Sequence, residues 1–154
     1  MLVSNRINFK IVVIENEITE RVIACAIKVH IALGPGLLES AYEACLYYEL
    51  FKNGHFVERQ KPVPLYYKEV RMDCGYRADL IVEKKVIIEI KSVEALNDIH
   101  LMQTITHLKL TTCKVALLIN FNVTKLKDGI RRVVNNFENV PDKPFDKGVS
   151  PFIN

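Results

Sequence analysis

The sequence predicts a single mixed α/β domain, built around a central sheet that is flanked by helices. Two segments with helical spacing of apolar residues open the chain, several short extended segments follow, and the remainder returns to helix, strand and helix. This order is typical of an α/β or α+β domain with a mixed sheet. The chain has 154 residues, of which 49% are apolar, so it is long enough to bury one hydrophobic core.

The first helix is predicted from Asn16 onward, and the residues before it form an N-terminal extension. Residues 1–15 contain one short apolar run without a clear period, which an edge strand would fit. Asn16 is a favourable N-cap with acidic residues in the turn that follows. Apolar residues then recur at helical spacing: Ile18, Val22, Cys25, Ala26, Val29 and Leu33. Gly-Pro-Gly at 34–36 ends the helix, because proline cannot continue its hydrogen bonds.

A second helix and a series of strands follow. The helix is expected from about residue 37 to residue 52, where Asn-Gly closes it. Its predicted inward face consists of Leu38, Ala41, Tyr42, Cys45 and Tyr48. From His55 the pattern changes to extended segments, which we expect at residues 55–60, 63–70, 73–82 and 86–91. Prolines at 62 and 64 indicate an edge or a kink within this region.

The C-terminal part contains a third helix, a buried strand and a fourth helix. Asn97 and Asp98 predict the start of the third helix, which runs to about Leu110 on a buried stripe of Leu101, Ile105 and Leu108. The near-continuous apolar run at 113–121 indicates a strand buried on both faces. The fourth helix is predicted at 125–136, with Ile130, Val133 and Val134 inward and Arg131 and Arg132 outward. The domain then spans 16–137, and the proline-containing residues 138–154 form a C-terminal tail.

Composition narrows the class of protein. The net charge of +3 permits contact with polyanions but does not by itself argue for nucleic-acid binding. The four cysteines lack any short metal-ligand spacing, so we interpret them as core residues of a reducing compartment and not as a zinc site: Cys25, Cys45, Cys74 and Cys113. Neither a signal peptide nor an apolar run of membrane-spanning length is present, so a cytoplasmic location is expected.

Two predicted core strands each carry a carboxylate, which is unusual for segments so rich in Ile, Leu and Val. In an antiparallel pair, opposed residues have a constant index sum. If Val82 pairs with Val86 across a turn of residues 83–85, then Asp79 lies directly opposite Glu89, with Cβ atoms about 5 Å apart. A two-residue turn would instead send the two carboxylates to opposite faces.

Opposed carboxylates in an apolar sheet are destabilising unless a cation neutralises them or one of them stays protonated. Hard oxygen ligands suit Mg²⁺ or Mn²⁺, which Asp79, Glu89 and a backbone carbonyl near Ile90 would hold together with water. Lys91 shares the face of Glu89 and would orient a water or neutralise charge on a phosphate. This set is suited to metal-assisted hydrolysis of a phosphodiester.

A solvated sheet face is the alternative. Arg77 shares a face with Asp79, and Lys91 shares one with Glu89, so two exposed ion-pair networks would also explain the charges. The local pattern by itself favours this simpler interpretation. Residues elsewhere in the chain favour the metal site.

The sequence GLLESAY at 36–42 resembles the signature of the GxxExxY protein family, which belongs to the PD-(D/E)XK nuclease superfamily. The resemblance extends from about residue 17 to residue 136 through GYRADLIV, IIEIKSVEAL, HLMQTITHLK, KVALLINF and LKDGIRRVV. It implies a restriction-endonuclease-like core. It also implies an active-site triad of Asp79, Glu89 and Lys91, with Glu39 as the helical acidic residue that supports the metal.

The same resemblance gives a role to the third helix. Gln103 matches a glutamine that orients the active site or the substrate in related nucleases, and His107 stands where many relatives carry tyrosine. From the residues alone, Gln103 and His107 form a pair one turn apart with His100 nearby, which is more often a polar rim than a ligand set. Two functional alternatives for His107 are a contact with phosphate and an effect on the metal preference of the site.

These observations predict a Mg²⁺-dependent nuclease that acts on nucleic acid, with DNA as the expected substrate. The alternative is a catalytically inactive module of the same fold that binds nucleic acid or a protein partner. Basic residues expected at phosphates are Arg77, Lys84, Lys85, Arg131 and Arg132. Since little of the chain lies outside the predicted core, we expect sequence specificity to come from a homodimer or a partner protein.

Overall fold

The computed structural model describes the backbone of residues 2–73 and 75–135 and the side chains of residues 14–73 and 75–135. The elements are α1 (Leu2–Leu33), α2 (Glu39–Lys52), β1 (Val57–Pro62), β2 (Leu65–Tyr67), β3 (Val70–Met72), β4 (Arg77–Val82), β5 (Val86–Lys91), α3 (Asp98–Leu110), β6 (Val115–Asn120), η1 (Leu126–Gly129) and β7 (Ile130–Val134). The C-terminal tail predicted at 138–154 lies outside the described residues. None of the described helices is long and apolar enough to cross a membrane.

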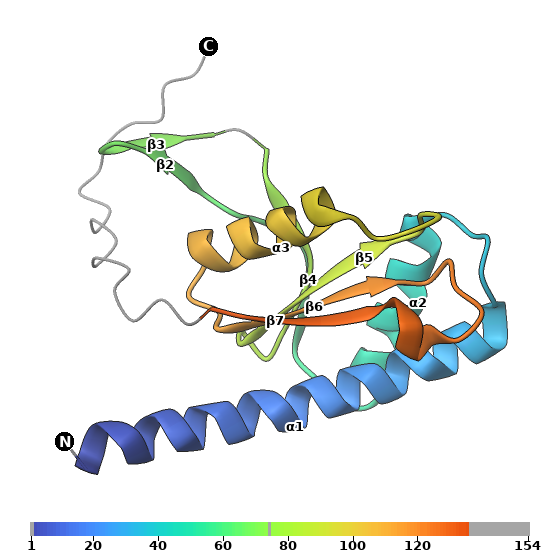
Figure 1. Cartoon of the computed structure of the whole chain (residues 1–154), viewed down its shortest axis with the longest axis horizontal. Coiled ribbons are helices and arrows are strands. Elements are labelled where there is room, and N and C mark those ends of the chain that lie inside the picture. Colours follow the sequence, from blue (N-terminus) through green and yellow to red (C-terminus); the bar gives the residue numbers. More distant parts are fainter. Residues whose placement is uncertain (1, 74, 136–154) are drawn as a thin grey trace.

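Five strands form the central sheet, in the order β1-β4-β5-β6-β7 (Figure 1). Strands β5 and β6 run parallel, and the other neighbouring pairs run antiparallel. The predicted mixed sheet is therefore confirmed. Every residue of β6 is buried, as expected for a strand covered on both faces.

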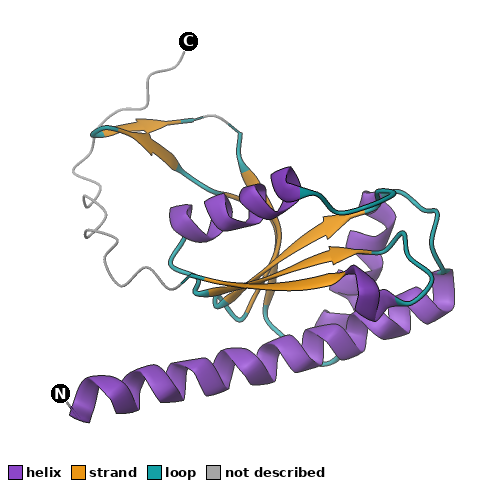
Figure 2. Cartoon of the chain, in the orientation of Figure 1, coloured by secondary structure: helices purple, strands orange, loops and turns teal. Residues whose placement is uncertain are grey.

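Helices cover both faces of this sheet, and each face has its own apolar cluster (Figure 2). On one face α1 and α2 pack against alternate residues of the strands, including Leu80, Ile88 and Ile90. On the other face α3 contributes Leu108, which packs with residues such as Ile87. Because side chains alternate along a strand, odd-numbered residues of β5 face α3 and even-numbered ones face α1 and α2. This alternation decides where Glu89 and Lys91 lie.

The edge strand considered for residues 1–15 is not formed, because α1 begins at Leu2. The helical spacing of apolar residues extends back from Ile18 through Ile14, Ile11 and Ile7. Asn16 is accordingly not a cap: its carbonyl lies inside α1 and accepts a hydrogen bond from the Thr19 hydroxyl (2.9 Å). The helix does end at Leu33, and Gly34 follows in the left-handed conformation (φ 67°).

The predicted fourth helix at 125–136 is also wrong. The chain forms a single 3-10 turn, η1, and then the edge strand β7, which pairs antiparallel with β6. Gly129 makes this turn possible, since a Cβ there would lie 2.2 Å from the carbonyl oxygen of Asn120. Val133 is buried and Arg131 and Arg132 are exposed. Five residues with this pattern fit a strand of period two as well as a helix, and the open edge of β6 favours the strand.

Two buried faces differ from their predictions. In α2 the buried residues are Tyr42, Glu43, Leu46 and Leu50, whereas Leu38 is 77% exposed and Tyr48 is 59% exposed. Leu38 is the N-cap residue and lies outside the helical stripe. In α3 the predicted core residue Leu101 is exposed.

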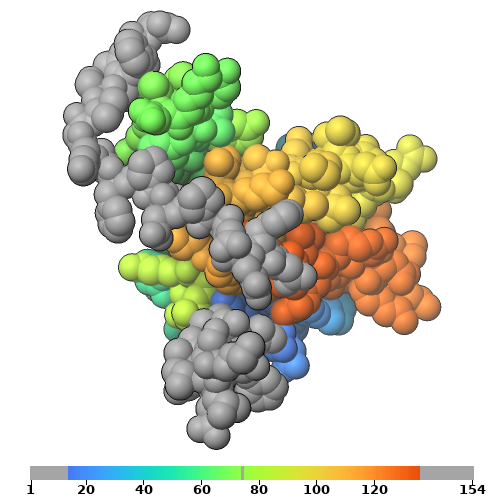
Figure 3. Space-filling view, turned by 60° about the vertical axis from the view of Figure 1, so that its left-hand side comes forward, coloured from blue at the N-terminus to red at the C-terminus, as the bar shows by residue number. Residues whose placement is uncertain are grey.

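The extended segment predicted at 63–70 is a separate hairpin. Strands β2 and β3 pair with each other in a two-stranded sheet. The turn that joins them contains Lys68, which has a positive φ of 55°. In the space-filling view this hairpin, in green, forms a prominence at one end of the molecule (Figure 3). The hairpin is inserted between β1 and β4 of the central sheet, and the chain returns to that sheet at Arg77, the first residue of β4.

Candidate active site

The β4–β5 hairpin has the register that the sequence predicts. Val82 pairs with Val86, and Leu80 pairs with Ile88. The three-residue turn is made without glycine: Glu83 and Lys84 adopt positive φ angles of 52° and 56°. The Lys85 N–H donates to the Val82 carbonyl (3.0 Å), which closes the turn. The regular pairs run from Val82–Val86 to Leu80–Ile88, and the direct pairing of Asp79 with Glu89 stays a prediction.

At the open end of this hairpin, Asp79 lies among polar partners. The regular pairing of β4 with β5 ends at Leu80, and Asp79 Oδ2 accepts a hydrogen bond from the backbone N–H of Ile90 (2.8 Å). Asp79 Oδ1 accepts a second one from Gln60 Nε2 (3.2 Å). The carboxylate therefore bridges β1 and β5 at the point where β4 diverges from β5. The predicted metal contact of the Ile90 carbonyl stays a prediction.

Glu89 lies on the α3 side of the sheet and is buried, with 5% of its surface exposed. Its Oε1 forms a hydrogen bond with Nδ1 of His107, which is buried in the last turn of α3. Tyr76 packs edge-on against the His107 ring, with centroids 5.9 Å apart. The predicted polar rim is therefore wrong for His107, because a side chain 7% exposed beneath Tyr76 is closed off from a phosphate in solution. The predicted solvated network around Glu89 and Lys91 is not present either.

Two glutamates of α2 approach the same region from the other side. Glu43 is buried, and its carboxylate accepts from Gln60 Nε2 (2.6 Å) and Arg59 Nε (3.2 Å). Glu39 is exposed at the start of the helix, and its Oε1 accepts from the backbone N–H of Ser92 (3.2 Å). Gln60 thus joins Glu43 to Asp79, whereas Glu39 is joined to the chain just beyond Lys91.

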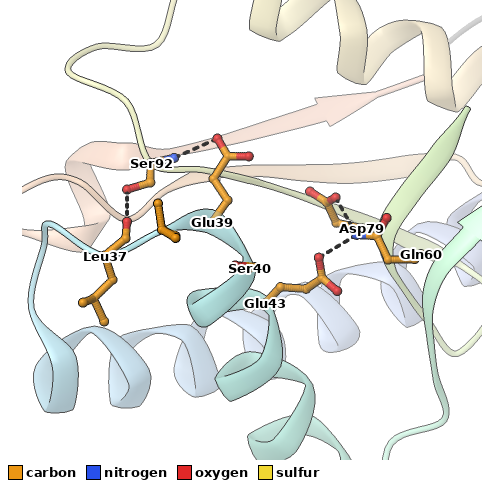
Figure 4. A pocket seen from close by; sticks show the side chains of 8 residues that line it. Leu37, Glu39, Ser40, Glu43, Gln60, Asp79 and Ser92 are labelled. Carbon is orange, nitrogen blue, oxygen red and sulfur yellow. Dashed lines mark hydrogen bonds between the residues drawn. The ribbon is translucent and has the colours of Figure 1, made fainter.

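These residues line an open pocket of about 540 Å³ between the start of α2 and the sheet (Figure 4). Its walls are Leu37, Leu38, Glu39, Ser40, Glu43, Gln60, Asp79 and Ser92. The close view shows Glu39 and Ser92 at one side of the pocket and the Glu43–Gln60–Asp79 chain at the other. Three carboxylates from two distant parts of the sequence therefore face one solvent-accessible space.

The electrostatics of Asp79 and His107 reflect this crowding. Burial, and then the negative charge of Glu89, raises the pKa of Asp79 to about 6, and Glu43 acts in the same direction. The hydrogen bond to Glu89 raises the pKa of the His107 imidazole above its ordinary value, against the opposing effect of burial. Lys91 is half-buried and lies close enough to His107 to oppose that rise. Negative charge is thus concentrated at the site, and His107 offsets part of it.

The donor set fits a hard divalent cation of the kind that retains its water. Within the part of the chain whose side chains are described, no three His, Cys, Asp or Glu residues lie close enough together to hold a metal ion. Mg²⁺ is commonly bound through one or two carboxylates with water in its other positions, so such a cage is not needed. Asp79 and Glu89 offer two carboxylates whose repulsion a cation would relieve.

Among the predicted site residues, Glu39 and Asp79 line the pocket, whereas Glu89 and Lys91 do not. The remaining ones are not among its walls either. Gln103 is exposed on α3 and has no hydrogen bond that joins it to the carboxylates. Arg77 is exposed and donates to the Gln60 carbonyl (3.0 Å). Lys84 and Lys85 are exposed at the turn, the opposite end of the hairpin from Asp79. Arg131 is exposed on the edge strand β7, where it donates to the backbone carbonyls of Asp128 and Ile130.

A comparison with protein families identifies the superfamily. A model described as the PD-(D/E)XK nuclease superfamily matches residues 16–133, which include the β4–β5 hairpin, α2 and α3. The chain belongs to this superfamily. Neither a comparison with curated proteins nor one with solved structures gave a match. The mixed five-stranded sheet flanked by helices is consistent with the restriction-endonuclease-like core that the superfamily shares.

Sequence reasoning missed two members of this nuclease-like site, Glu43 and Gln60. Glu43 follows Glu39 by one helical turn, so the helical period alone could have suggested it. Gln60 gave no signal, because its role depends on pairing β1 with β4 and on its own left-handed backbone (φ 47°). A non-glycine residue in that conformation on an edge strand is strained, and strained residues cluster at functional sites.

Proposed function

We propose that this protein is a divalent-metal-dependent nuclease that hydrolyses phosphodiester bonds in nucleic acid, with DNA as the expected substrate. One observation carries the proposal: Asp79 lines an open pocket while its carboxylate is repelled by Glu89 across the hairpin and by Glu43 on α2. A stable domain gains nothing from this repulsion. A domain that binds a cation does, because Asp79, at the pocket, and Glu89, buried behind it on the α3 side, then become ligands.

Each residue has a role in the proposal. Asp79 and Glu89 hold the ion, and His107 keeps the Glu89 carboxylate in one orientation. The ion, when bound, supplies Lewis-acid stabilisation of the phosphate and a more acidic water. Lys91 orients the attacking water or neutralises the developing charge. Glu39 supports the site through Ser92, and Gln103 meets the substrate from α3.

The test is a cleavage assay on labelled single- and double-stranded DNA and RNA, with Mg²⁺ or Mn²⁺ and with EDTA. We expect metal-dependent cleavage by the wild-type protein. Asp79→Ala, Glu89→Gln and Lys91→Ala should each lower the rate by about 10³-fold, since each removes several kcal/mol of transition-state stabilisation. Glu94→Gln, at an exposed carboxylate beyond β5, is the matched control and should leave the rate unchanged. Cleavage that persists in EDTA or in Asp79→Ala contradicts the proposal.

A catalytically inactive binding module is the second candidate. The observation that favours it is the His107–Glu89 pair, which offsets the Glu89 charge without a metal. Such a module would bind nucleic acid in EDTA, lose affinity as salt rises, and cut none of the substrates above. Mg²⁺-dependent cleavage of any of these substrates excludes it.

A further inference from the structure

The outer side of α2 exposes large aromatic side chains close to the candidate active site. Phe51 is 65% exposed and Tyr48 is 59% exposed, while Tyr47 is half-buried. Cations lie over two of the rings: Arg59 is 5.1 Å from the Tyr47 centroid, and Lys52 is 5.9 Å from that of Tyr48. Tyr47 packs partly against the core, whereas Phe51 and Tyr48 are mostly exposed, and the burial of their rings against a ligand would stabilise a complex.

A continuous series of contacts connects these rings to the pocket. Asp79 accepts from Gln60 (3.2 Å), and Gln60 donates to Glu43 (2.6 Å). Arg59 donates to the same Glu43 (3.2 Å) and lies over the ring of Tyr47. Tyr47 in turn stacks on Phe51, with ring centroids 6.1 Å apart and planes 20° from parallel. We define Arg59, Tyr47 and Phe51 as the aromatic track, and it begins beside the candidate catalytic carboxylates.

The track has the composition that binds a single strand of nucleic acid. Successive bases stack on aromatic rings whatever their sequence, and arginine contributes through its charge and its flat guanidinium group. Duplex nucleic acid offers no free base faces to such rings, because its bases are already stacked on each other. The chemistry of the track therefore distinguishes single strands from duplexes.

We propose that the aromatic track binds a single strand of nucleic acid, DNA or RNA, and directs it to the pocket that contains Asp79. The inference rests on the proposed function for the fate of the strand, because the track supplies binding and the carboxylates supply cleavage. It assigns the substrate class of the site: an unpaired strand or the unpaired end of a duplex. Phe51, which is 65% exposed, takes a base, and the Tyr47–Arg59 pair beside it continues the track to Glu43 at the pocket.

Binding in EDTA tests the track separately from cleavage. The probes are fluorescein-labelled oligomers of dT and of U, about 15 nucleotides long, and a duplex of the same length, followed by fluorescence anisotropy. Phe51→Ala should weaken single-strand binding about tenfold and leave duplex binding unchanged, since one base loses its stacking partner. Phe51→Trp should restore the affinity. The dT and U probes separate DNA from RNA, and a loss with either one supports the track.

Tyr67→Ala is the matched control. Tyr67 is 62% exposed on the β2–β3 hairpin and has Lys68 5.6 Å from its ring, so it has the same chemistry outside the track. Single-strand affinity within twofold of wild type in Phe51→Ala overturns the proposal. An equal loss of single-strand affinity in Tyr67→Ala, or an equal loss of duplex affinity in Phe51→Ala, also overturns it. A wild-type dimer that Phe51→Ala converts to monomers overturns it as well, because this face would then be a protein contact.

The two proposals fail in different ways. If no nucleic acid is cleaved but Phe51→Ala still weakens single-strand binding, then the nuclease proposal fails and the track stands. If cleavage depends on Mg²⁺ and Asp79 but Phe51→Ala leaves single-strand binding intact, then the track fails and the nuclease stands.

Discussion

The two ends of the β4–β5 hairpin are made of the same two strands, and they serve different purposes. At the closed end, Val82 and Val86 pair regularly and are fully buried, and the turn beyond them tolerates two left-handed residues. At the open end, the regular pairing stops at Leu80. The Asp79 carboxylate there accepts a hydrogen bond from the Ile90 N–H. The closed end fixes the register, and at the open end the Glu89 charge is close enough to Asp79 to raise the pKa of its carboxyl.

Stability and chemistry are therefore separated along one short element. The closed end gains free energy from apolar burial. The open end loses free energy to the repulsion between Asp79 and Glu89, which His107 relieves only in part. Substitutions at the closed end should therefore change stability more than chemistry, and those at the open end should do the opposite.

The largest effect on stability is expected at the closed end. Ile87 is fully buried against the α3 face, so Ile87→Ala should lower the free energy of unfolding by about 2–5 kcal/mol. Urea denaturation measures this change. Ile87→Val should cost only about 0.5–1.5 kcal/mol and keep the cleavage rate of the folded protein. A strong loss of rate in Ile87→Val, with stability retained, would show that the two ends are not separate.

At the open end we expect a smaller change in the free energy of unfolding, and in the stabilising direction. Asp79→Asn removes the repulsion and keeps an acceptor for the Ile90 N–H, so the metal-free protein should gain about 1–2 kcal/mol at pH 8. Urea denaturation in EDTA at pH 5 and pH 8 measures it, with Glu69→Gln at the exposed hairpin turn as the control.

The pH dependence of wild-type stability has a definite sign. The folded protein holds the Asp79 proton more tightly than the unfolded chain does, because the pKa rises from 3.8 to about 6. Stability should therefore fall as pH rises between about 4 and 6. The raised pKa of His107 adds a further loss of stability as pH rises, at higher pH than the part due to Asp79. In Asp79→Asn the fall should be smaller, with the parts due to His107 and to Glu15, whose pKa burial also raises, remaining. An unchanged pH dependence would contradict the assignment to Asp79.

The smallest change in stability is expected at the turn between β4 and β5. Lys84 has a φ of 56°, so Lys84→Gly should relieve strain and change stability by no more than about 1 kcal/mol in the stabilising direction. The same variant tests the predicted phosphate contact of Lys84. If duplex affinity falls several-fold in Lys84→Gly, then the closed end also takes part in binding.

Local patterns predicted the elements whose cause is local. The hairpin register followed from parity and from a three-residue turn, and Gly-Pro-Gly gave the end of α1. Sequence patterns failed to predict elements and side-chain positions that depend on contacts between residues far apart in the chain. The five residues of β7 fit two periods until the open edge of β6 is considered, and the position of His107 beneath Tyr76 depends on how α3 packs. Gln60 joins the site only through the pairing of β1 with β4.

The central claim is that Asp79 and Glu89 together form a divalent cation site. Titration of Mn²⁺ into metal-free protein, followed by isothermal calorimetry and by the electron paramagnetic resonance of the free ion, tests it most directly. The account predicts saturable binding to the wild-type protein that is lost in Asp79→Asn and in Glu89→Gln and kept in Glu94→Gln. Binding that survives in Glu89→Gln, or no binding to the wild-type protein, would contradict it.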